Sequence, residues 1–325
     1  MDQAYAPRHD PTESSPPLQR RELTVADQRQ RVHRAYAAAT VGVPTAGIIA
    51  AIVLAFTRGV STTEWVLFGV MYAATALGIE AGFHRYFSHR AFRGSRFVTY
   101  LLGALGSMAG QGPVIFWAAT HRAHHAATDR EGDPHSPWLH GSGLRRRLRG
   151  LYHAHMGWLF HADRSDWARL TPDLLKDRDI VRINMWYPML LTLGLATPAA
   201  IGFLVMGTEG LWRGALWGGL ARIFALDHVT WAVNSFGHIF GRRPYASNNH
   251  SGNIALLALP SFGGSWHNNH HAFPASARND HHLYQLDLSG LFIEALARVG
   301  LASDVNRPRQ LARRAAAPRQ ETQKQ

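Results

Sequence analysis

The chain has 325 residues, a formal net charge of +12 and no cysteine. Without thiolate ligands, iron–sulfur clusters, zinc ribbons and disulfides are excluded together. The positive charge alone would fit a nucleic-acid partner. However, the basic residues flank hydrophobic segments, which fits anionic lipid headgroups and an acidic substrate or redox partner better. We therefore expect no nucleic-acid role.

The chain opens with a polar arm, residues 1–34, whose prolines predict disorder leading into an interfacial helix. The first hydrophobic segment begins only after this arm and is too long for the core of a signal peptide. Four such segments contain few charges and are each about the twenty residues that cross a bilayer: 35–57, 65–83, 186–206 and 211–233. We therefore expect an integral membrane domain over residues 35–305, followed by a flexible tail over 306–325.

A fifth apolar stretch, residues 97–119, is not expected to cross the membrane. It contains Gly103, Gly106, Gly110, Gly112 and Pro113, and non-helical backbone is tolerated at membrane depth only where protein buries it. A crossing here would also separate the histidine clusters on its two sides. We interpret the stretch as an amphipathic or re-entrant segment, so that four crossings in two hairpins leave every cluster on one face.

The basic residues predict which face this is. Thirty-one of the 34 Lys and Arg residues lie before the first span, between residues 84 and 185, or after residue 233. By the positive-inside rule, that face and both termini are cytoplasmic. Because arginine greatly outnumbers lysine in an alanine-rich chain, we expect a bacterial protein in the inner (cell) membrane.

Nine of the twenty histidines follow the hydrophobic segments in a distinctive pattern. In HRAHH (121–125) and HNNHH (267–271), the first histidine precedes the others by three and four residues, so on a helix all three imidazoles share one face. His84 and His89 are five residues apart, which turns an α-helix about 140° beyond a full circle. That pair should therefore straddle a helix terminus, and His238 stands alone before the third cluster.

Neutral imidazole suits iron, zinc, copper or nickel, so the clusters predict a metal site held almost wholly by histidine. The chain has no Glu-x-x-His pair, which carboxylate di-iron bundles require. Isolated histidines such as His9, His33, His140 and His250 are interpreted as ordinary surface or core residues.

The three clusters HRYFSH (84–89), HRAHH (121–125) and WHNNHH (266–271) resemble those of the membrane fatty-acid desaturases, the class of stearoyl-CoA desaturase. The resemblance covers roughly residues 35–305 and is greatest to the delta-9 acyl-CoA members. It also includes DREGDPHSP (129–137), HMGWLF (155–160), TWAVNSFGH (230–238) and HHAFP (270–274).

The resemblance implies an all-α membrane protein with four transmembrane helices under a cytosolic helical cap that holds two irons. It implies an O₂-dependent oxidoreductase that introduces a cis double bond, at delta-9, into a saturated acyl chain. Asn234, otherwise a helix-packing amide, would bind metal through a water. The implied direct ligands are His84, His89, His121, His124, His125, His238, His267, His270 and His271.

Further residues are expected to support the ligands and to line the substrate site. Ligating imidazoles need acceptors for their other N–H groups, and Glu80, Asp129 and Asp133 are candidates, although helix-end solvation or capping is an alternative. A bent substrate tunnel is implied at Gln111, Trp117 and Thr230. On sequence alone, a Trp at a membrane boundary is more often an interfacial anchor.

The sequence departs from the animal acyl-CoA enzymes where those bind the CoA headgroup. This chain has Gly112, Ala119 and Thr120 before the second cluster, and GGS (263–265) before the third. The acyl carrier is therefore open between CoA, acyl-carrier protein and intact lipid.

Two alternatives remain open at this point. One is a membrane fatty-acid or alkane hydroxylase, although those relatives usually place three residues, not four, between the first histidines. The other is a metal transporter or store, although transporters bind their ions at mid-span. Since we identify no haem or flavin domain, electrons should come from a separate ferredoxin, rubredoxin or b-type cytochrome with its reductase. Chain length and oligomeric state are not indicated.

Overall fold

The computed structural model describes residues 20–161 and 166–308. Most of the expected N-terminal arm and C-terminal tail lies outside the described residues. Residues 20–34 of the arm belong to helix α1, which runs from Arg20 to Arg58. The described chain is mostly helical, as predicted. The all-α expectation misses one small antiparallel sheet, in which β1 (Arg93–Gly94) pairs with β2 (Ala302–Ser303).

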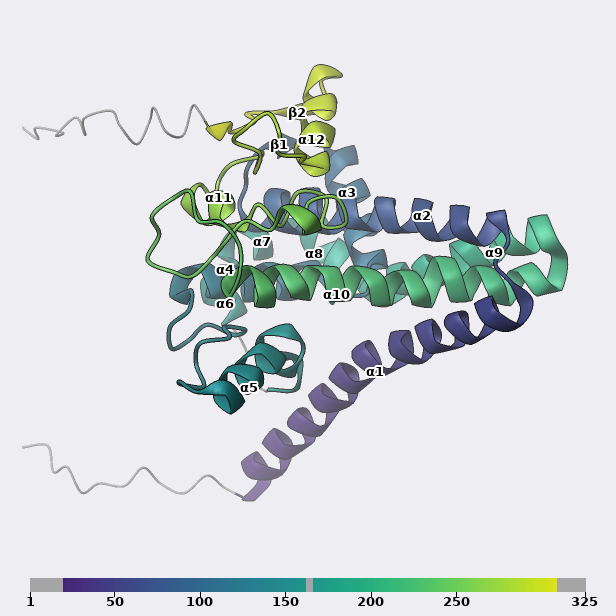
Figure 1. The fold of residues 1–325 in the computed structure, drawn as a ribbon, viewed down its shortest axis with the longest axis horizontal. Helices are drawn as coiled ribbons and strands as arrows, with labels where there is room; N and C mark the ends of the chain where they lie inside the picture. Colours follow the sequence, from purple (N-terminus) through teal and green to yellow (C-terminus); the bar gives the residue numbers. More distant parts are fainter. Residues whose placement is uncertain (1–19, 162–165, 309–325) are drawn as a thin grey trace, which may run out of the picture.

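Long helices form a bundle that extends away from the end where α4 and α11 lie (Figure 1). In it, α2 (Thr62–Leu77) continues as the π-helix η1 (Gly78–Ser88). Helix α9 (Tyr187–Gly214) continues through the π-helix η3 (Ala215–Ala221) into α10 (Arg222–Ser235). Within the described residues, three stretches are long and apolar enough to cross a membrane: Gln30–Arg58, Thr62–Ser88 and Tyr187–His238.

The third stretch has 52 residues and does not run straight. Gly207 has φ 64° and ψ −150°, which interrupts the helix. Residues before and after Gly207 pack against each other: Gly210 lies on Gly202, and Gly214 lies on Pro198. The contacts are so close that a Cβ on Gly210 would clash with the Gly202 carbonyl oxygen, and a Cβ on Gly214 with that of Pro198. The two sides of Gly207 therefore pack antiparallel, and α9 contains a reversal that separates the expected segments 186–206 and 211–233.

The first reversal, between α1 and α2, is fixed by polar contacts. Ser61 and Glu64 form a capping box, in which the Ser61 amide donates to Glu64 Oε2 at 2.6 Å. Arg213 forms an ion pair with the buried Glu64 at 2.7 Å and donates to the Gly59 carbonyl at 2.8 Å. One arginine thus joins the α1–α2 turn to the helix that follows Gly207.

The expected re-entrant segment, residues 97–119, comprises most of α3 (Arg96–Met108) and the start of α4 (Val114–Ala127). Gly78 packs on Gly106 and Gly82 on Leu102, so α3 runs antiparallel to η1. The chain turns at Gly110 and Gly112, which both have positive φ. Since α4 then runs back along η1, the segment returns to the end of the bundle that it left.

Shorter elements complete that end of the molecule. They are α5 (Leu144–His155), η2 (Gly157–Phe160), α6 (Trp167–Leu170), α7 (Pro172–Leu175), α8 (Arg178–Met185), η4 (Phe236–His238), η5 (Ala255–Leu257), α11 (His267–Ala272) and α12 (Leu288–Arg298). The main hydrophobic core lies between η1, α3, α4, α8 and α12 and includes the fully buried Phe83, Phe87, Leu102, Ile183 and Ile293.

The long helices expose large apolar side chains. Phe56 on α1 is 90% exposed and Leu204 on α9 is 81% exposed, and many neighbours on α1, α2 and α9 are about half exposed. Apolar surface of this extent is unusual for a protein in water and typical of one that contacts lipid. The exposed surface and the three apolar stretches together show a membrane-associated helical protein.

Candidate metal centre and substrate pocket

Helix η1 positions the first histidine pair by its unusual geometry. The backbone amide of His89 donates to the carbonyl of His84 at 3.1 Å, an i→i+5 hydrogen bond of the π-helical type. His89 lies directly after the last residue of η1. The pair therefore straddles a helix terminus, as predicted. The wider π-helical turn, which the sequence did not reveal, brings the two rings to 5.1 Å between centroids.

The second and third clusters lie on helices, as predicted. HRAHH belongs to α4, and HNNHH forms most of α11. Helix α11 has only six residues, too few to be stable alone, and buried asparagines secure it. Asn253 Oδ1 accepts from the amides of Asn268 and Asn269 at 2.9 and 3.2 Å, and the Asn253 amide group donates to Asn269 Oδ1.

The nine histidines converge in two groups. Their ring nitrogens are close: His84 Nε2 lies 3.0 Å from His270 Nε2, and His238 Nε2 lies 2.9 Å from His267 Nε2. His125 joins the first group, since its Nε2 lies 2.9 Å from that of His270. Adjacent residues of α4 thus serve different groups. The groups are His84, His89, His121, His125 and His270, and His124, His238, His267 and His271.

Three of these histidines face a carboxylate with the other ring nitrogen. His84 Nδ1 lies 2.8 Å from Glu80, His124 Nδ1 lies 3.0 Å from Asp133, and His238 Nδ1 lies 2.9 Å from Asp129. All three candidates from the sequence are therefore in contact with a histidine of the clusters.

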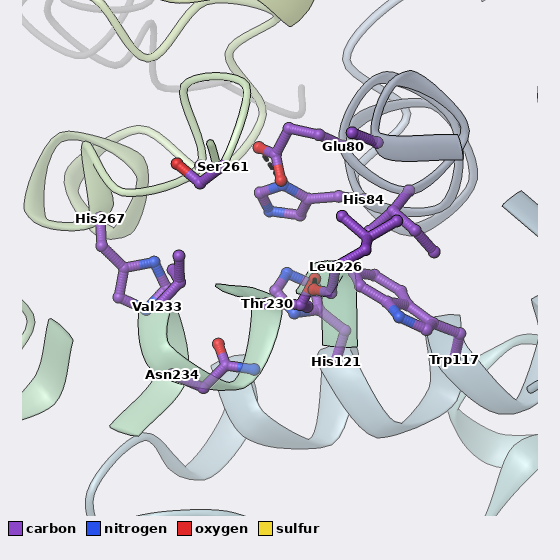
Figure 2. A pocket seen from close by; sticks show the side chains of 13 residues that line it. Glu80, His84, Trp117, His121, Leu226, Thr230, Val233, Asn234, Ser261 and His267 are labelled. Carbon is purple, nitrogen blue, oxygen red and sulfur yellow. Dashed lines mark hydrogen bonds and ion pairs between the residues drawn. The ribbon is translucent and has the colours of Figure 1, made fainter. Parts of the chain in front are cut away.

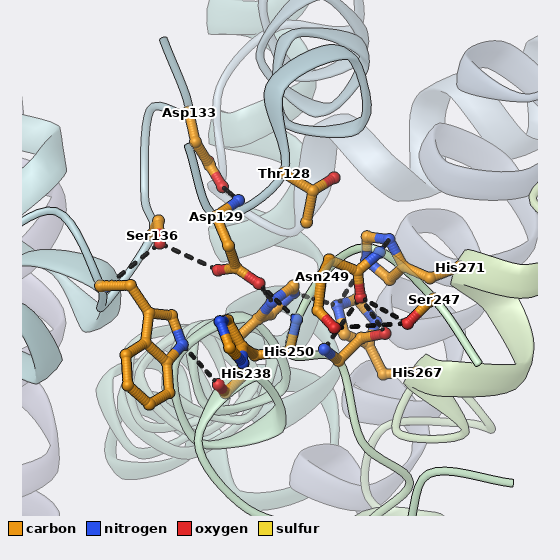
Figure 3. A network of polar contacts seen from close by, with 12 residues as sticks. Thr128, Asp129, Asp133, Ser136, His238, Ser247, Asn249, His250, His267 and His271 are labelled. Carbon is orange, nitrogen blue, oxygen red and sulfur yellow. Dashed lines mark hydrogen bonds and ion pairs between the residues drawn. The ribbon is translucent and has the colours of Figure 1, made fainter. Parts of the chain in front are cut away.

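The carboxylates are themselves held in place, as Figure 3 shows for Asp129. Asp129 accepts from the Ser136 hydroxyl at 2.9 Å and from the His250 amide at 2.7 Å. Asp133 accepts from the amides of Asp129 and His135 at 2.8 and 3.1 Å. Burial opposes ionisation of Asp133, but the contact with His124 outweighs it and holds the pKa of the carboxyl below its usual value.

This arrangement tests whether a metal fits. A carboxylate beside Nδ1 requires that nitrogen to carry the proton, so Nε2 of His84, His124 and His238 presents a lone pair. Each of these lone pairs points at another imidazole nitrogen 2.9–3.3 Å away. Two buried lone pairs that face each other repel unless a proton or a metal cation lies between them. The donor set therefore fits metal ions that prefer imidazole.

The protonation state of the other histidines is also suitable. Burial, reinforced by neighbouring imidazoles, lowers the pKa of His121, His125, His267, His270 and His271 well below the usual value. These rings are therefore neutral at physiological pH, which is the form that binds metal.

A pocket opens beside the first group (Figure 2). Trp117, His121 and Asn234 line it, together with the apolar side chains Ile79, Leu226 and Val233. Asn234, the predicted water-mediated ligand, therefore lines the same pocket as His121 and His267.

The three residues expected at the tunnel bend are linked through Gln111. The Gln111 amide group donates to Thr230 Oγ1 at 3.0 Å, and the Trp117 indole N–H donates to Gln111 Oε1 at 3.2 Å. Trp117 also stacks on His121, with 5.1 Å between ring centroids. Two of the three, Trp117 and Thr230, line the pocket.

Comparison with known proteins identifies the family. Residues 62–295 match the model of the fatty acid desaturase family. The chain belongs to the fatty acid desaturases. It is therefore an oxidoreductase that acts on acyl chains, and the histidine groups are its candidate iron centre.

Similar proteins differ in the carrier of the acyl chain. The desaturase is 42% identical over 269 residues to a hex-5-enoyl-[acyl-carrier protein] acetylenase of Moorena producens (strain JHB), covering 82% of this chain and 84% of the relative. It is 36% identical over 251 residues to an sn-1 stearoyl-lipid 9-desaturase of Anabaena variabilis, covering 75% and 86%. It is 32% identical over 265 residues to an acyl-CoA C20 Delta5-desaturase of Anemone leveillei, covering 78% of each chain.

Sequence reasoning missed two supports of the desaturase centre. His135 is buried and stacks on His124 at 4.4 Å, and with Asp133 and His124 it forms a third group of possible ligands. Its position in DPHSP, two residues after Asp133, was the available signal.

The second missed support is Arg85, which is buried on η1 and forms ion pairs with Glu80 and Asp287, at 3.2 and 2.8 Å. Its neighbour His84 drew the attention in the sequence, but Arg85 orients the carboxylate that holds His84.

Proposed function

We propose that this desaturase uses two irons and O₂ to introduce a cis double bond into a saturated fatty acyl chain, at delta-9. One iron would be bound by His84, His89, His121, His125 and His270. The other would be bound by His124, His238, His267 and His271, with Asn234 acting through a water. The proposal rests on the convergence of nine histidine side chains, in two groups, beside a pocket with apolar walls.

When bound, the two irons supply, from O₂ and two electrons, an oxidant able to attack an unactivated methylene. Each double bond removes two hydrogens from the chain, and these, with two electrons and two protons, convert O₂ to two waters. The protein's own residues do the positioning. Ile79, Leu226 and Val233 exclude water around the acyl chain, while Glu80, Asp129 and Asp133 hold the Nδ1 protons of their histidines.

The carrier and the electron donor belong to the same proposal. We assign an acyl chain bound to acyl-carrier protein as the substrate, because a relative with 42% identity is named for such a substrate. The relatives named for acyl-lipid and acyl-CoA substrates have lower identity. Electrons come from a separate ferredoxin, rubredoxin or b-type cytochrome.

We also propose four membrane crossings in two hairpins, with both termini and the metal centre cytoplasmic in a bacterial inner membrane. The reversal at Gly207 supports four crossings, because it divides the 52-residue apolar stretch into two antiparallel parts. The hairpin of α3 and α4 supports a re-entrant segment, because its ends lie at the same end of the bundle. In the sequence, 25 of the 34 Lys and Arg residues lie between residues 84 and 185 or after residue 233, the segments that contain the histidine clusters, as expected for a cytoplasmic face.

Product analysis tests the reaction. The purified, iron-loaded enzyme with O₂, a ferredoxin and its reductase should convert a stearoyl chain to the cis-9 monoene, detected by gas chromatography after release from the carrier. A hydroxylated chain with no alkene would contradict desaturation. An alkene at another position would contradict only the delta-9 assignment.

The bend residues should determine where the double bond forms. An oxidant of this strength attacks the nearest C–H bond, so the position of the chain determines the site of reaction. We expect Thr230→Trp or Trp117→Ala to lower activity or redistribute the products, while the iron content stays near that of wild type. Gas chromatography of the monoenes measures this. Unchanged products formed at unchanged rates by both variants would show that these residues only pack the membrane boundary.

A further inference from the structure

Helix α5 presents a group of arginines that the desaturase reaction does not use. Arg145, Arg146, Arg147 and Arg149 are all exposed, and none forms an ion pair or side-chain hydrogen bond with another described residue. Successive residues of an α-helix are rotated by about 100°, so these four side chains spread over more than half of the helix circumference. Four unpaired positive charges on one helical turn and a half form a strong local field.

The helix is nevertheless fixed firmly to the metal centre. Gly150 packs directly on the Pro137 carbonyl, in the loop that carries Asp129 and Asp133. At its last residue, His155 Nδ1 lies 3.0 Å from the hydroxyl of Ser235 at the end of α10. In the same loop, the Trp138 indole donates to the carbonyl of His238 at 2.8 Å. In Figure 1, α5 lies at the same end of the bundle as α4 and α11, the two helices that carry the second and third histidine clusters.

The exposed part of α5 is also apolar in places. Leu144 is 74% exposed and Leu148 is 57% exposed, and by helix geometry both lie in the sector between Arg147 and Arg145 that the arginines leave free. Every residue from 142 to 149 is exposed, so the first half of the helix is accessible to a partner. A flat lipid surface would meet only one side of such a helix. A partner protein whose surface curves around it would meet the leucines and the arginines together.

We propose that the first half of α5 is the docking surface for the acidic protein that carries the acyl chain. The inference rests on the proposed function, because it supplies the means by which a carrier-bound chain reaches the pocket. Charge complementarity selects the partner: the arginines require carboxylates opposite them, and the leucines require a small apolar patch. Docking here places the carrier beside the loop and the helix end that support the second histidine group.

Charge reversal tests this inference. The test variant carries two substitutions on α5, Arg145→Glu and Arg149→Glu. The control variant carries Lys176→Glu and Arg178→Glu, which change the charge by the same amount. The side chains of Lys176 and Arg178 are also exposed and unpaired among the described residues. Each iron-loaded enzyme is placed in nanodiscs of neutral phosphatidylcholine. Both the binding of unacylated acyl-carrier protein and kcat/KM for the stearoyl-carrier protein are measured at low and at high salt.

For the α5 variant, we expect roughly tenfold weaker binding and a kcat/KM lower by a similar factor at low salt, with the difference reduced at high salt. Most of the effect should be in KM, and the control should stay close to wild type. Equal losses in both double variants would overturn the inference. If the α5 variant lost as much kcat/KM with stearoyl-CoA as with the carrier protein, the arginines would be a phosphate site and the inference would be overturned. A loss seen only in discs that contain phosphatidylglycerol would indicate a lipid contact and would also overturn it. The binding assay needs no turnover, so it distinguishes failed docking from failure of the proposed reaction.

Discussion

His124→Ala is expected to reduce turnover to below about one-hundredth of wild type, because even residues that only support metal ligands change activity ten- to a hundredfold. The His124 ring is 1% exposed, with Asp133 at its Nδ1 and His271 3.3 Å from its Nε2. Removing it opens the second group and leaves Asp133 buried without its main partner. His270→Ala should do the same to the first group. Turnover and iron per chain are measured on protein purified from iron-replete cells.

His140→Ala is the matched control, because His140 belongs to neither histidine group. It should keep most of the activity and all of the iron. Equal losses from His124→Ala and His140→Ala would mean that the clusters have no special role in catalysis.

Asp133→Asn should weaken iron binding by roughly ten- to a hundredfold, because a carboxamide fixes the His124 ring less well and supplies no negative charge. The substitution keeps the size of the side chain, so the fold should persist. Glu131→Gln is the control: it lies two residues earlier in the same loop, is exposed and removes the same charge. Iron retained after dialysis against graded concentrations of chelator gives the relative affinities. Indistinguishable retention by the two variants would show that Asp133 acts only in the loop structure.

The sequence was sufficient where a short-range spacing determines the geometry. The three-and-four spacing in HRAHH and HNNHH predicted helices with all three rings on one face, and both helices are present. Glu80, one turn before His84, was identified by the same reasoning and lies 2.8 Å from it. These features depend on neighbours within one or two turns of the chain.

The sequence was insufficient where distant segments determine the structure. Which histidines share a group depends on the packing of η1, α4, η4 and α11, so spacing alone could not assign His124 and His125 to different groups. The π-helix over Gly78–Ser88 carries no reliable local signal, and an α-helical estimate overstates the angle between His84 and His89. Arg85 also looked like any basic residue near a membrane boundary, because its partner Asp287 is 202 positions away.

Polar contacts stabilise the backbone at each end of the bundle, and the sequence alone did not reveal these contacts. Glu64 and Arg213, 149 residues apart, join the two reversals far from the histidines. At the other end, the Asn253 side chain accepts from the backbone amides of Asn268 and Asn269 and so holds the short helix α11, although the sequence drew attention only to the histidines of that helix. In both cases, a polar residue stabilises a backbone segment that would be marginal alone.

The iron content of active enzyme tests the central claim most directly. Protein purified from iron-replete cells should contain about two irons per chain by elemental analysis, because nine imidazoles in two groups exceed what one ion can bind. Activity should rise with iron content and reach its maximum near two. Full activity with zinc alone, or with a single iron per chain, would contradict the di-iron centre.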